Sequence, residues 1–200
     1  FKQNKYQEIV KASRDLNEYQ NDHFFYDLSV EYFWKIADLP EEFRDIDIAF
    51  YYKNYLKNLS EERAILFEEG VFSQIYERVI NNSADKKKTK GLPELLKTIS
   101  TSKNEGAAFR ALIILSDLNK EKDAISSKKY LTKVFETLNK DLPKNFFSNL
   151  NEVYYWKIKE LCLRFKEFDY LIFYTKFSNG LNDNKKYFLE NALGDYYIEK

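Results

Sequence analysis

Apolar residues in this chain recur at steps of three and four positions, which is the spacing of one face of an α-helix. The clearest stripe consists of Tyr154, Ile158, Leu161 and Phe165. After the short segment 166–169, a second stripe consists of Tyr170, Phe173, Tyr174 and Phe177. Two amphipathic helices joined by so short a turn are expected to lie antiparallel. The pattern therefore predicts helical hairpins.

Few residues interrupt the helical pattern, because the 200 residues include 5 glycines and 3 prolines. Strong helices are expected over residues 49–59, 108–118 and 153–165. Helix 108–118 is predicted to be the most buried, since its inward positions are all aliphatic. Each proline follows a leucine and precedes one of these helices, at Pro40, Pro93 and Pro143. Leu-Pro is a common dipeptide, so chance and a repeat of about 50 residues explain this spacing equally well.

The expected fold is all-α, with about nine or ten helices in antiparallel pairs that stack as a right-handed superhelical solenoid. We expect one helical-repeat domain over residues 1–200, with a sub-boundary at the polar loop 81–92. That loop contains four lysines, Lys86, Lys87, Lys88 and Lys90. Such a run is usually a solvated loop, and its functional interpretation is a contact to phosphate or to an acidic peptide.

The charges balance, since Lys and Arg number 32, Asp and Glu number 32, and the formal net charge is +0. A balanced chain has no overall field that would draw it to nucleic acid or to an anionic membrane. The longest aliphatic run, residues 111–115, is far shorter than the ~20 residues of a membrane span. Residues 1–30 lack the order of a secretory signal, and the single Cys162 fits a reducing compartment. We therefore expect a soluble, cytoplasmic protein.

The sequence offers few residues for catalysis or for metal binding. His23 is the only histidine, and no cluster of His and Cys is available to hold a metal ion. A nucleophilic pair would have to use His23, and nothing places it beside Cys162 or a serine. The carboxylates always offer chance pairs, so hydrolysis by acids alone stays open. We predict no enzymatic activity, no metal and no cofactor.

Residues 187–200 form a separate helical pattern at the end of the sequence. Leu193 and Tyr197 are four positions apart and share a helix face, and Gly194 beside them permits close approach of a second helix. This is the shape of the first helix of a hairpin, and we interpret the chain as part of a longer protein. One apolar face of the helix should be open to water. We expect the helix to fray or to dock on a neighbouring molecule, and self-association is one form of docking.

Two segments of the C-terminal third read Leu-Gly-Asp-Tyr-Tyr at residues 193–197 and Phe-Lys-Glu-Phe-Asp-Tyr at residues 165–170. The first resembles the core of the first helix in the tetratricopeptide (TPR) family, and the second is similar to that family's turn into the second helix. The spacing of the family's second helix is matched at Phe135, Leu138 and Pro143. The sequence departs from the family at Glu190, where a large aromatic residue is usual, and at Leu138, where a small residue is usual. The resemblance implies stacked hairpins with a concave groove that binds a peptide or another protein without catalysis.

Binding residues are predicted on the helix faces that do not enter the core. In stacked hairpins, one series of helices lines the inner surface. The predicted partner-binding side chains are Tyr51, Arg110, Tyr155 and Lys159. Tyr and Arg are enriched in binding hot spots, and the basic groups suit an acidic partner. The alternative is that these side chains seal contacts between neighbouring helices.

The predicted function is non-enzymatic binding of a protein or a peptide, as a scaffold, an adaptor or a peptide-sensing regulator. The sensing role rests on fold analogy alone. The alternative function is RNA binding by a helical-repeat surface. The zero net charge and the lack of regularly spaced basic positions disfavour that alternative.

Overall fold

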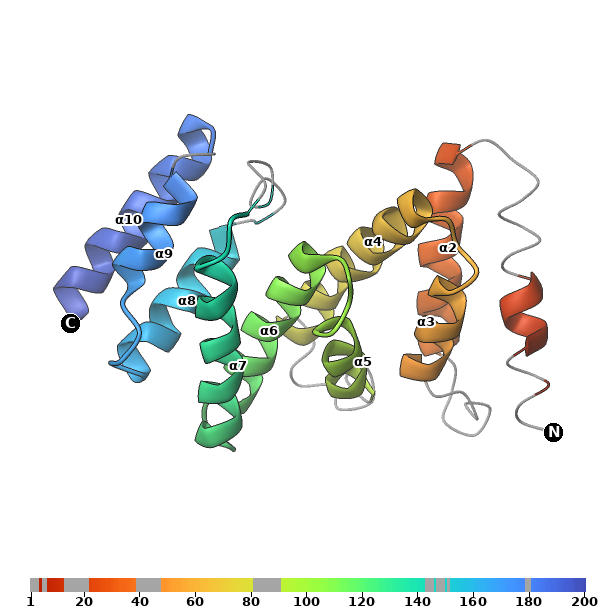
Figure 1. Cartoon of the computed structure of the whole chain (residues 1–200), viewed down its shortest axis with the longest axis horizontal. Coiled ribbons are helices and arrows are strands. Elements are labelled where there is room, and N and C mark those ends of the chain that lie inside the picture. Colours follow the sequence, from red (N-terminus) through yellow and green to blue (C-terminus); the bar gives the residue numbers. More distant parts are fainter. Residues whose placement is uncertain are drawn as a thin grey trace. The chain divides into compact units, whose positions relative to one another are not determined.

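The computed structural model describes residues 4, 7–12, 22–38, 48–80, 91–142, 146, 150, 152–178 and 181–200, apart from the side chains of 22–29 and 76–80. All regular secondary structure within these ranges is helical (Figure 1). This confirms the all-α prediction. The lysine run of residues 86–90, Pro40 and Pro143 lie outside the described residues.

The chain divides into two compact units, unit 1 from Phe1 to Thr98 and unit 2 from Ile99 to Lys200. The division falls within helix α5 (Leu92–Ile99). The sequence predicted one domain with a sub-boundary at residues 81–92, which lie just before this point. Each unit is described by itself below.

Unit 1 contains α2 (Asp22–Ala37), α3 (Ile48–Leu56) and α4 (Glu61–Ile80), and α2 packs against both α3 and α4. Its core is a cluster of aromatic rings. The ring of Phe33 on α2 stacks on Tyr51 with a centroid distance of 5.9 Å, and Tyr55 meets Phe67 edge-on at 4.7 Å. Offset and edge-on geometries of this kind are the favoured ones for aromatic pairs. The aromatic residues of α3 are thus used to hold three helices together.

Helix α4 passes through Gly70 without a break. Gly70 is buried, as are Phe67 and Val71 on the same side of the helix. Ile65 is half-exposed. It lies two positions before Phe67, which places it about 200° away around the helix axis, on the opposite side from the core.

Unit 2 contains α6 (Glu105–Asn119), α7 (Ala124–Leu138), α8 (Glu152–Arg164), α9 (Tyr170–Ser178) and α10 (Asp183–Glu199). Helix α6 packs most extensively against α7, and the two lie side by side in Figure 1. The carboxylate of Asp123 accepts a hydrogen bond of 3.0 Å from the backbone N–H of Ser126. Asp123 thus caps the N-terminus of α7 and satisfies one of the unpaired N–H groups of the first turn.

Every residue of α6 from Phe109 to Ser116 is buried. A helix with buried residues all the way round is enclosed on several sides. The described contacts agree, because α6 packs against both α7 and α8. The prediction that this aliphatic helix lies deep in the interior is confirmed, with Leu118 as an exposed exception.

Helices α8 and α9 are joined by residues 165–169 and contact one another, but α8 packs more extensively against α10. The side of α10 that faces its neighbours carries Leu189, Ala192 and Tyr196, which are all buried. The ring of Tyr196 lies 5.5 Å from that of Tyr170 on α9. Helix α10 is therefore docked against both α8 and α9 along one side, and it remains helical to Glu199.

Candidate functional site

The four predicted partner-binding side chains are all buried. Their exposed fractions are 1% for Tyr51, 5% for Arg110, 0% for Tyr155 and 7% for Lys159. Tyr51 belongs to the aromatic core of unit 1, whereas the other three belong to unit 2. The prediction assumed that these side chains face away from the core, and burial contradicts that assumption. We therefore assign them structural roles.

Arg110 and Lys159 have polar partners although they are buried. The Nε of Arg110 donates a hydrogen bond of 3.2 Å to the carbonyl oxygen of Gly106, one turn earlier in α6. The Nζ of Lys159 on α8 lies 2.8 Å from Oε1 of Glu199 on α10, and 5.2 Å from the ring centre of Trp156. A cation over an aromatic face is attracted by the ring. This arrangement fixes the last turn of α10 to α8.

The hydroxyl groups of Tyr155 and Tyr170 are buried, and neither has a hydrogen-bond partner among the described residues. Burial raises the pKa of Tyr155 to about 12, and it also raises the pKa of Tyr170 and of the Cys162 thiol. The cause is that desolvation disfavours the charged form. All three groups are therefore neutral at physiological pH, and Cys162 has little thiolate with which to act as a nucleophile.

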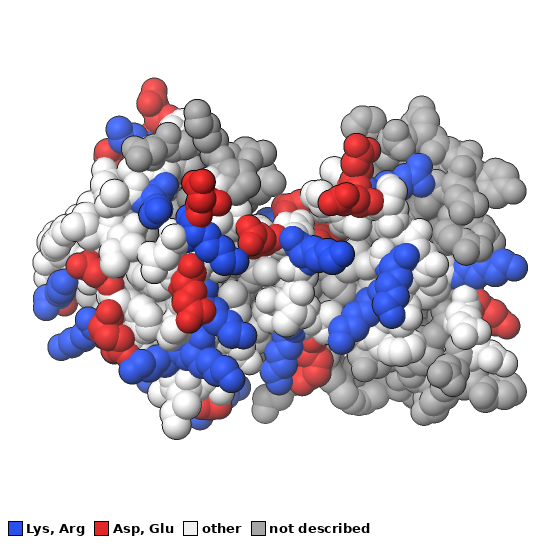
Figure 2. Space-filling view, in the orientation of Figure 1, with Lys and Arg blue, Asp and Glu red and all other residues white. Residues whose placement is uncertain are grey.

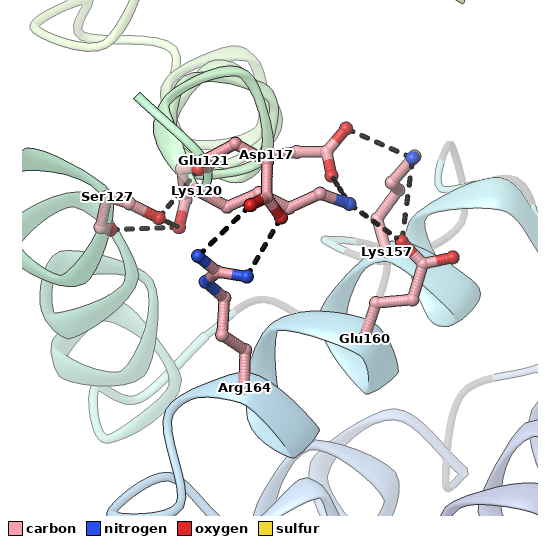
Figure 3. Close-up of polar contacts among 8 residues, drawn as sticks. Asp117, Lys120, Glu121, Ser127, Lys157, Glu160 and Arg164 are labelled. Atoms are coloured by element: carbon pink, nitrogen blue, oxygen red, sulfur yellow. Dashed lines mark hydrogen bonds and ion pairs between the residues drawn. The ribbon is translucent and has the colours of Figure 1, made fainter. Parts of the chain in front are cut away.

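A closed ring of ion pairs joins the end of α6 to α8 (Figure 3). Asp117 lies 2.8 Å from Lys120 and 3.0 Å from Lys157, and Glu160 lies 3.1 Å and 3.7 Å from the same two lysines. The contact of Asp117 Oδ1 with Lys120 is an ion pair without hydrogen-bond geometry. Because two acids face two bases, the ring has no net charge to attract a ligand.

Two further contacts extend this connection between helices. Arg164 on α8 donates to both oxygens of the Glu121 carboxylate, at 2.8 and 3.3 Å. Ser116 on α6 and Ser127 on α7 each donate to the other's backbone carbonyl, at 2.8 and 2.7 Å. Both serines are fully buried, so these bonds satisfy hydroxyl groups that would otherwise be costly to bury. The polar clusters of unit 2 are thus explained by packing.

The described residues include no group of three or more His, Cys, Asp or Glu side chains placed to hold a metal ion. His23 lies in α2, and its side chain is outside the described part of the structure. Within the same limits, the helices include none with the length and apolar character needed to cross a membrane.

Exposed apolar side chains are frequent on the last two helices. Half of the large hydrophobic residues found exposed in the described structure lie on α9 and α10, namely Leu171, Ile172, Tyr187, Phe188, Tyr197 and Ile198. We call these six residues the C-terminal apolar surface. Charged side chains of both signs are interspersed among the described residues on the face shown in Figure 2. The C-terminal apolar surface is therefore the best candidate functional site.

The sequence pattern pointed to an open face of α10 around Leu193, Gly194 and Tyr197. Gly194 and Tyr197 are exposed, as predicted, whereas Leu193 is partly buried. A helical projection that starts from Leu189, Ala192 and Tyr196 would have placed the open side correctly, because it lies opposite those residues. The amino-acid pattern offers no reason to choose that starting point, since apolar residues occur all round this helix.

Comparison with models of protein families, with curated proteins and with solved structures found no match to this chain.

Proposed function

We propose that this chain is a non-enzymatic, cytoplasmic helical-repeat domain that binds another protein or a peptide through the C-terminal apolar surface. The supporting observation is the exposure of six large apolar side chains on two neighbouring helices. Apolar patches of a few hundred Å² on a soluble protein commonly mark interaction sites. A partner that covers such a patch with its own apolar side chains would remove this surface from water.

A TPR-like stacked arrangement is part of this proposal. Its support within unit 2 is that successive helices pack on one another, α6 on α7 and α8, and α8 on α9 and α10. The exposed side of α9 and α10 would then be the place where a further helix adds to the stack. The chemistry of the partner follows, since an amphipathic helix presents apolar residues at steps of three and four to such a face. Scaffold, adaptor and peptide-sensing roles all use this kind of contact.

A selection from a library of displayed peptides tests the proposal. The expected result is enrichment of sequences with helical apolar spacing, whose binding is weakened at least tenfold by Ile198→Lys. The matched control is Ile125→Lys on α7, because Ile125 and Ile198 are both 84% exposed. Binding that both changes weaken equally would show that the C-terminal apolar surface is not the site.

A second experiment, titration with RNA, separates protein binding from RNA binding. The mixed charges in Figure 2 favour protein over RNA, because nucleic acid is bound by continuous basic regions. Wild-type protein is titrated with single-stranded and double-stranded RNA at two salt concentrations. Tight, salt-dependent RNA binding without enrichment of any peptide would overturn the proposed function.

A further inference from the structure

We draw no further inference here: the strongest candidate, the exposed apolar side of α9 and α10, belongs to the site already described, and nothing in the described part of the structure shows what covers it.

Discussion

Replacing Tyr155 by phenylalanine is expected to stabilise unit 2, although the change removes a polar group from a side chain that is fully buried. The hydroxyl groups of Tyr155 and Tyr170 have no hydrogen-bond partner among the described residues. Tyr52 in unit 1 is just as buried, but its hydroxyl donates a hydrogen bond of 2.7 Å to Oε1 of Glu68. The same chemical change should therefore have opposite effects at these positions.

The magnitudes follow from the cost of desolvating a hydroxyl group. A buried polar group without a partner costs about 1–3 kcal/mol, so Tyr155→Phe and Tyr170→Phe should each stabilise unit 2 by about 1 kcal/mol once imperfect packing is allowed for. A hydrogen bond to a carboxylate contributes about 1.5–3 kcal/mol, so Tyr52→Phe should destabilise unit 1 by about that amount. For a unit of this size, 1 kcal/mol corresponds to about 4–8 °C in melting temperature.

The two tryptophans make the assay specific for each unit. Trp34 lies in unit 1 and Trp156 in unit 2. A Trp34→Phe background therefore reports the unfolding of unit 2 by fluorescence, and a Trp156→Phe background reports unit 1. Urea unfolding of each Tyr→Phe variant in both backgrounds gives the free-energy change in its own unit, with the other unit as the internal control.

The dependence on pH gives an independent check. Burial raises the pKa of Tyr155 from 10.0 to about 12 in the folded state. The folded protein then holds this proton more tightly than the unfolded chain, so stability is full below pH 10 and is lost as pH rises through 12. Tyr155→Phe should make this loss smaller. Destabilisation by Tyr155→Phe at neutral pH would refute the reasoning, because it would mean that the hydroxyl group is hydrogen-bonded. An unchanged alkaline slope would show that burial does not raise the pKa of Tyr155.

Three further changes test the packing of unit 2. Leu115→Ala should destabilise it by about 2–5 kcal/mol in urea unfolding, through lost burial and a cavity, whereas Ile125→Ala should be nearly neutral because Ile125 is exposed; equal effects would contradict the central position of α6. Glu199→Ala should destabilise unit 2 by about 1–2 kcal/mol and speed amide hydrogen exchange in the last turns of α10, since Lys159 loses its partner. Unchanged exchange would show that the pair does not anchor the helix. Gly194→Ala should stabilise dilute, monomeric protein by about 0.5–1 kcal/mol, because the added methyl group meets open space. The melting temperature should therefore rise, and a lower value would show that the methyl group meets a neighbouring atom.

The sequence predicts the helices well because their signals are local. Asp123 is recognisable as a cap from its position before a stripe of apolar residues, and the aliphatic composition of α6 correctly predicts a central helix. The candidate site was not predictable in the same way. Helical periodicity assigns one inward stripe to α8 and leaves Tyr155 and Lys159 outside it, but α8 packs against α6, α9 and α10, so burial extends around most of the helix. A one-dimensional pattern does not reveal how many neighbours a helix has.

The ion pair between Lys159 and Glu199 has a consequence for the orientation of α10 about its own axis. Apolar residues occur on every side of this helix, so several rotations would bury similar areas and differ little in hydrophobic free energy. The ion pair of Glu199 with Lys159 on α8 favours one rotation over the others. Most other rotations would leave Lys159 buried without its partner. The pair thus sets the rotation of α10 about its own axis. It determines which residues of α10 are presented to other molecules, and a change at Glu199 could alter binding specificity without unfolding the protein.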